Sequence, residues 1–185
     1  MKAIMMSIKP EWIAKILNKE KTIEVRKRFP INYVGWVYIY CTKKYDECLW
    51  YKKDSQRYVL NYGKPTNDYL NGKVVARFWC KKVEKIRSYL EPEQWYATID
   101  LGGSGLLQKS CLSFEELDDY LLSANGCAIH ITKLEIFDKP KEISEFKHYK
   151  KFSEIDYMLP VPRKETCERL VPLTRAPQSW CYAEI

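Results

Sequence analysis

The chain has 185 residues, 46% of them hydrophobic and 14% aromatic, which suits one enlarged domain with a sizeable core. A formal net charge of +7 and a pI near 8.9 favour polyanionic partners, although the same balance occurs in proteins that bind none. No apolar run approaches the roughly 20 residues that span a bilayer, and residues 1–9 lack the apolar region of a signal peptide. We therefore expect a cytoplasmic protein with no membrane partner.

The cysteine pattern limits the chemistry further. There are seven cysteines, and no pair has Cys-x-x-Cys spacing, which argues against a disulfide framework and against an ordinary zinc site. Reduced thiols fit this pattern best. We expect no metal and no cofactor, and nothing in the sequence indicates an oligomeric state.

The first predicted elements are a strand over residues 2–8 and a helix over about residues 9–19. Pro10 suits the first helical turn, where its missing N–H costs nothing, and Glu11 lies favourably near the positive end of the helix dipole. Apolar side chains then recur at three- and four-residue spacing, at Trp12, Ile13, Ile16 and Leu17. This pattern predicts a helix that buries one stripe against the core.

The next segment is a charged run with the period of a strand. Ile23 and Val25 face one way, so the polar residues around them face the other. The candidate site set is Lys21 at the start of the strand, then Thr22, Glu24 and Arg26. A cation, a carboxylate and a guanidinium at one sheet edge suit a planar polar ligand with a nearby phosphate. The alternative is a solvated strand face with surface salt bridges, and spacing alone does not decide between them.

The remaining pattern predicts a mixed α/β chain. Alternation predicts strands over residues 34–41, 74–87 and 127–137, the second with a bulge near Lys81 and Lys82. Residues 42–71, where basic and aromatic residues interleave, are interpreted as an insertion of loops and short helix. Their residue types suit single-strand binding, or tyrosines packing a small satellite core.

A second helix and an irregular C-terminal region complete the prediction. Ser113 and Glu116 form a capping box that opens the helix, and Gly126 suits its C-terminal stop. Several prolines make the C-terminal third extended and irregular. Its last residues are polar and aromatic, so we expect them to dock on the domain.

The segment Ser7-Ile8-Lys9-Pro10, the helix behind it and the spacing Lys21-x-x-Glu24-x-Arg26 together resemble the ASCH family, in particular its larger prokaryotic or phage-type members. The family pattern is Gly-x-Lys-x-x-Glu-x-Arg. Lys19 replaces its glycine, so the turn there either avoids a glycine-only conformation or bears strain. The close match covers about residues 1–40, with weaker resemblance over residues 72–86 and 127–137.

The resemblance implies an α+β fold: a PUA-like β-pseudobarrel of about five to six mixed strands with flanking helices. It implies one ASCH/PUA-like domain over residues 1–185, with an insertion at about 42–71 and an extended C-terminal segment at about 153–185.

The resemblance also implies recognition of RNA, another single-stranded nucleic acid or a modified nucleoside in a basic cleft. Glu24 would accept hydrogen bonds from a base edge, Arg26 and Lys21 would hold phosphate or carbonyl, and an aromatic ring would stack on the base. Lys9 joins this binding set through the Ser-Ile-Lys-Pro segment. Similar larger members end in an Arg, Pro, Gln, Ser, Trp segment, which places three further residues near the cleft, namely Gln178, Ser179 and Trp180. The alternative for Trp180 is a terminal strand whose indole only plugs the barrel.

An enzymatic alternative comes from the same resemblance. Some small ASCH proteins deacetylate 4-N-acetylcytidine with a lysine, a threonine nucleophile and a glutamate, and others have been linked to RNA cleavage. The position that matches the nucleophile is Glu24, and a carboxylate does not replace an acyl-forming alcohol without a different mechanism. An amidohydrolase or ribonuclease would therefore use Lys21 and Glu24 to activate water, or Thr22 if the backbone were displaced. A third alternative is an interaction module, which needs no preorganised pocket.

Overall fold

The structure of the chain is a computed structural model that describes residues 2–44, 46–63, 69–90, 97–100, 105–122, 124–156 and 163–185. Its described strands include β1 (Ala3–Ile8), β2 (Ile23–Arg26), β3 (Gly35–Cys41), β6 (Val74–Leu90), β7 (Ala97–Asp100), β8 (Gly126–Lys141) and β11 (Trp180–Ala183). They form one sheet in the order β11-β1-β3-β6-β8-β2, with β7 paired to β6 off this path. β1 and β3 are parallel and the other pairs antiparallel, so the sheet is mixed as predicted.

Both faces of the sheet are covered. Val37 and Ile39 of β3 belong to the main core, whereas Tyr38 and Tyr40 on the opposite face pack in a separate buried cluster with Phe146. The predicted bulge in β6 is confirmed by a register shift between Cys80 and Val83. None of the described helices has the length and apolar character needed to cross a lipid bilayer.

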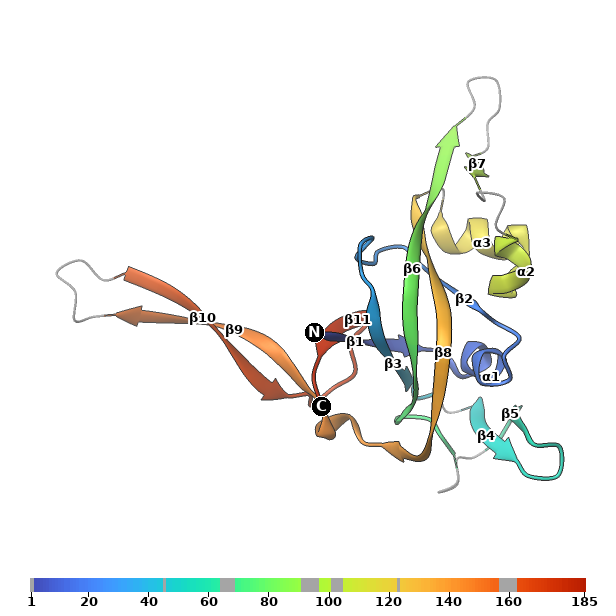
Figure 1. The fold of residues 1–185 in the computed structure, drawn as a ribbon, viewed down its shortest axis with the longest axis horizontal. Coiled ribbons are helices and arrows are strands. Elements are labelled where there is room, and N and C mark those ends of the chain that lie inside the picture. Colours follow the sequence, from blue (N-terminus) through green and yellow to red (C-terminus); the bar gives the residue numbers. More distant parts are fainter. Residues whose placement is uncertain are drawn as a thin grey trace.

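In the part of the chain that the structure describes, three α-helices flank the sheet: α1 (Pro10–Leu17), α2 (Leu106–Ser110) and α3 (Phe114–Leu121). Figure 1 shows all three on the β2 side of the sheet. The capping box of α3 forms as predicted, because Ser113 Oγ accepts from Glu116 N and Glu116 Oε2 accepts from Ser113 N. The predicted stop at Gly126 is wrong. Leu122 ends the helix in the left-handed conformation with φ 54°, and Gly126 instead opens β8.

The turn between α1 and β2 contains the residue that replaces the family glycine. Lys19 has φ 63°, so it adopts the left-handed conformation that glycine takes without strain. Its backbone N–H donates to Ile16 O and helps to end the helix. Of the two alternatives from the sequence, the structure therefore has the strained turn.

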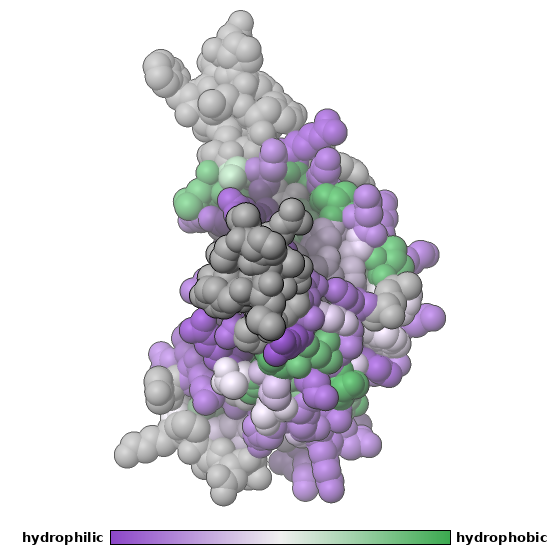
Figure 2. Space-filling model, turned by 90° about the vertical axis from the view of Figure 1, so that its left-hand side faces the viewer, coloured by the Kyte–Doolittle hydropathy of each residue, from purple (hydrophilic) through white to green (hydrophobic). Residues whose placement is uncertain are grey.

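The described residues also form two hairpins outside the main sheet. One pairs β4 (Cys48–Lys52) with β5 (Arg57–Asn61), and the other pairs β9 (Lys147–Asp156), which follows the 3₁₀ helix η1 (Ile143–Glu145), with β10 (Arg163–Pro172). Figure 1 shows the β9–β10 ribbon projecting from the body, and Figure 2 shows a mainly hydrophilic surface on the face that carries it.

These hairpins correct two sequence interpretations. The described part of residues 42–71 holds a β-hairpin and no helix, because the aromatic residues pair across strands; the rings of Tyr51 and Tyr58 lie 5.0 Å apart. The Asn18 side chain bonds to the backbone N–H and C=O of Tyr58 and anchors this hairpin to α1. In the C-terminal third, residues 163–172 form a regular strand, and Pro172 is tolerated at its end.

Candidate functional site

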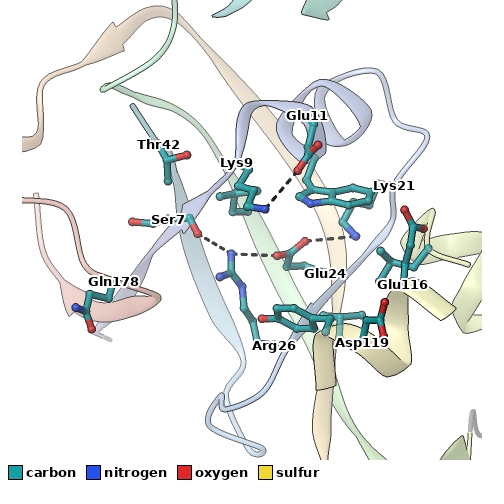
Figure 3. A pocket seen from close by; sticks show the side chains of 15 residues that line it. Ser7, Lys9, Glu11, Lys21, Glu24, Arg26, Thr42, Glu116, Asp119 and Gln178 are labelled. Carbon is teal, nitrogen blue, oxygen red and sulfur yellow. Dashed lines mark hydrogen bonds and ion pairs between the residues drawn. The ribbon is translucent and has the colours of Figure 1, made fainter. Parts of the chain in front are cut away.

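An open cavity of about 640 Å³ lies between α1, β2, α3 and the C-terminal segment. This volume is within the range of small-molecule sites, about 300–1,000 Å³. In Figure 3, Lys21, Glu24 and Arg26 cross the middle of the cavity, with Gln178 at one side and Glu116 and Asp119 at the other. The polar and aromatic side chains that line it are Ser7, Lys9, Glu11, Trp12, Lys21, Glu24, Arg26, Thr42, Glu116, Asp119, Tyr120 and Gln178.

The centre of the cavity is a buried charge triplet. Glu24 Oε2 lies 3.5 Å from Lys21 Nζ, and Glu24 Oε1 lies 3.0 Å from Arg26 Nη2. The exposed fractions of the three side chains are 2% for Lys21, 7% for Glu24 and 11% for Arg26. Two cations and one carboxylate leave one positive charge in excess. Burial lowers the pKa of Lys21, and the Glu24 charge only partly offsets this effect.

Backbone carbonyls from other elements hold the two cations in place. Lys21 Nζ donates to Ser110 O at the end of α2 over 2.6 Å, and Arg26 Nη2 donates to Ser7 O of β1 over 2.6 Å. The triplet therefore ties β1, β2 and α2 together. Arg26 Nε is buried without a hydrogen-bond partner among the described residues, which leaves an N–H donor uncompensated.

The rim of the cavity carries further charges and rings. Lys9 Nζ lies 3.7 Å from Glu11 Oε1 and is mostly exposed. The α3 face adds two carboxylates and a phenol through residues spaced i, i+3 and i+4, namely Glu116, Asp119 and Tyr120. Burial raises the pKa of Tyr120, while the neighbouring Arg26 acts in the opposite sense. The described lining has three cations (Lys9, Lys21 and Arg26) and four carboxylates (Glu11, Glu24, Glu116 and Asp119). The cavity therefore has mixed charge, whereas a basic cleft around Glu24 was expected.

The structure gathers some of the predicted site residues and separates others. The residues that line the cavity are Lys9, Lys21, Glu24, Arg26 and Gln178. Thr22 lies outside it with an exposed side chain, and its backbone is bound by Lys109 O and Ile131 N. Ser179 is also absent from the lining, although its carbonyl accepts from Ser7 N and so docks the C-terminal segment.

Trp180 packs against the main core and does not line the cavity. Its Nε1 donates to Arg28 O over 2.8 Å, and its ring lies edge-on to Phe29 with the centroids 5.6 Å apart. This is the placement that the plug alternative describes.

Sequence reasoning missed the contribution of α3 to the cavity. The signal was present as the polar spacing of Glu116, Asp119 and Tyr120 on one helix face. That spacing is equally typical of an ordinary solvated helix surface, so it carries little information without the fold. Among the described residues, no group of three or more His, Cys, Asp or Glu side chains is arranged to hold a metal ion.

Comparison with solved structures finds ASCH structures from Zymomonas mobilis. A serine-to-alanine mutant of that ASCH protein has a TM-score of 0.51 and 14% identity, and the match covers 98% of this chain and 87% of that one. The ASCH structure itself has a TM-score of 0.48 and 15% identity, and the match covers 77% of this chain and 74% of that one. A tyrosine-to-phenylalanine mutant has a TM-score of 0.47 and 15% identity, and the match covers 77% of each chain. No family model and no curated protein matches the sequence. The chain has an ASCH-like fold.

Proposed function

We propose that this protein binds a nucleobase, within a nucleic acid or as a modified nucleoside, in the cavity of Lys21, Glu24 and Arg26. The observation that carries the proposal is the buried charge triplet in an open cavity. Its two cations are already fixed by Ser110 O and Ser7 O. Groups that are held before the ligand arrives bind it at a smaller cost in conformational entropy.

The polar groups of the triplet are complementary to the edge of a base. A carboxylate accepts from amino and imino groups, and Glu24 has lone pairs beyond the two contacts to its cations. The Arg26 guanidinium, whose side chain is 11% exposed and lines the cavity, supplies N–H donors for a base carbonyl or ring nitrogen. Trp12 and Tyr120 add aromatic surface to the lining. Because carboxylates outnumber cations in this lining, a neutral base fits it better than a bare phosphate chain does.

Calorimetric titration tests the proposal, with the common ribonucleosides, 4-N-acetylcytidine and short RNA as ligands. Arg26→Lys keeps the charge but removes the planar set of donors, so the ligand that binds should do so at least tenfold more weakly. A loss of about 1.5–3 kcal/mol for a hydrogen bond to a charged group corresponds to roughly 10- to 150-fold in affinity.

Arg57→Lys is the matched control, since Arg57 is exposed on β5 and is outside the cavity lining. It should bind like the wild type. Absence of binding to every ligand, or a folded Arg26→Lys variant with wild-type affinity, would refute the proposal.

A second candidate function is hydrolysis of an acylated nucleoside or of RNA, and the lowered pKa of Lys21 beside Glu24 favours it. With an acylated nucleoside, Glu24 would take a proton from water, the water oxygen would attack the acyl carbon, and the C–N bond would break as the protonated Glu24 returns that proton to the nitrogen. The covalent alternative through Thr22 lacks support, since that side chain is not in the lining.

Chromatography of 4-N-acetylcytidine and of mixed RNA after incubation tests this candidate. Turnover should disappear in Lys21→Met and Glu24→Gln and persist in Thr22→Ala. Binding without turnover in the wild type would leave recognition of the base as the function.

A further inference from the structure

A second cavity, of about 590 Å³, has a different charge from the first. We call it the basic groove, and its lining comprises Lys27, Ile31, Lys85, Ile86, Arg87, Asn125, Gly126 and Cys127. Three of these residues are cations, and no carboxylate is among the described residues that line it. The groove therefore attracts anions, whereas the first cavity has mixed charge.

Two cations of the groove, Lys85 and Arg87, lie on the face of β6 that packs in the main core earlier in the strand. Val83, two residues before Lys85, belongs to the main core, and so does Cys127, which pairs with Lys85 in the sheet. The register from Val83 to Ile86 is regular, so Lys85 and Arg87 continue the core-facing side of β6. Both are exposed, and alternate residues of a strand lie roughly 7 Å apart. The core-facing side of β6 therefore continues as two neighbouring positive charges in the lining of the basic groove.

The end of β2 joins the groove to the first cavity. Arg26 lines the first cavity, and the next residue, Lys27, lines the groove. The Nζ of Lys27 also lies 5.7 Å from the ring centroid of Tyr120, which borders the first cavity. One strand end and one aromatic ring therefore separate a site of mixed charge from a site of positive charge.

We infer that the base in the first cavity belongs to a single-stranded polynucleotide whose phosphates, next to that base, lie in the basic groove on Lys27, Lys85 and Arg87. The inference rests on the proposed function and specifies its substrate class. Lysine and arginine neutralise backbone phosphates without reading sequence, whereas the triplet contacts the base. A free nucleoside would occupy the first cavity alone and leave the groove empty.

Fluorescence anisotropy with labelled single-stranded octamers tests the inference, using RNA and DNA of one mixed sequence. The test variant is Lys85→Gln with Arg87→Gln, which removes both charges and keeps long side chains over the end of the core. The control is Lys81→Gln with Lys139→Gln, which removes two exposed lysines outside both cavities, on β6 and β8. Nucleoside binding is measured on the same proteins by calorimetry.

The expected result is a change in salt dependence. Each neutralised phosphate of a single strand adds about 0.7 to the log-log slope, so the test variant should lose about 1.4 of it. Between 50 and 200 mM salt, the wild type should therefore lose about sevenfold more affinity than the test variant does. The control variant should keep the wild-type slope, all three proteins should bind the nucleoside equally, and RNA and DNA should show one slope.

Two results would overturn the inference. If the test variant keeps the wild-type slope, the groove does not hold phosphates; nucleoside binding that depends on Arg26 would leave the proposed function intact. If neither nucleoside nor octamer binds the wild type, the proposed function and the inference fail together.

Discussion

Replacing Glu24 by glutamine tests whether the triplet is one electrostatic unit. The substitution keeps the shape of the side chain but removes the negative charge between Lys21 Nζ at 3.5 Å and Arg26 Nη2 at 3.0 Å. Both cations remain buried, and each is still held by its backbone carbonyl. The folded protein would then enclose two positive charges without a compensating carboxylate.

The expected cost follows from this burial. Removing one partner of a buried ion pair costs about 3–5 kcal/mol, because the remaining charge stays desolvated. Lys21→Met should cost less, about 1–2 kcal/mol, since it leaves the balanced Glu24–Arg26 pair and loses chiefly the hydrogen bond to Ser110 O. The double variant should cost less than the sum of the single variants, because only one uncompensated charge remains.

Urea unfolding at neutral pH measures these differences as shifts in midpoint at constant slope. The matched control is Glu135→Gln, which removes a carboxylate from the half-exposed pair with Arg77 and should cost at most about 1 kcal/mol. A Glu24→Gln variant no less stable than this control, or a Lys21→Met variant less stable than Glu24→Gln, would refute the reasoning.

Three further predictions concern the elements around the site. Burial lowers the pKa of Lys21 in the folded protein below 10.5. Between this lowered pKa and 10.5, the unfolded chain binds more protons than the folded protein, so the free energy of unfolding rises with pH in this range. The gain is lost again as the pH falls through the lowered pKa. Lys21→Met should remove that rise in a pH series of urea midpoints, and an unchanged series would contradict it. Ser113→Ala should cost about 1 kcal/mol, since it removes the cap of α3, and thermal unfolding would show no shift if the cap were irrelevant. Trp180→Phe should lower stability by about 1 kcal/mol through the lost bond to Arg28 O, without weakening ligand binding; weaker binding at equal folded fraction would give the indole a stacking role.

The sequence determined the elements whose signals are local. Pro10 begins α1, the capping box begins α3, and alternation in residues 34–41 predicts the strand β3. Such signals depend on neighbours a few residues away, so they can be recognised without the fold. The Lys21, Glu24 and Arg26 spacing is of this kind too, because two-residue periodicity places Glu24 and Arg26 on one strand face.

Only the tertiary structure decided what this spacing does. Lys21 is desolvated against Ser110 O, which is 89 residues away in the chain, and the C-terminal segment reaches the site because Ser7 Oγ donates to Pro177 O, 170 residues away. Contacts between distant segments also place the partly buried Trp180 against the main core and the α3 residues at the cavity. Periodicity states which residues share a face, but burial, pKa and cavity shape depend on what packs against that face, and those partners come from distant parts of the chain.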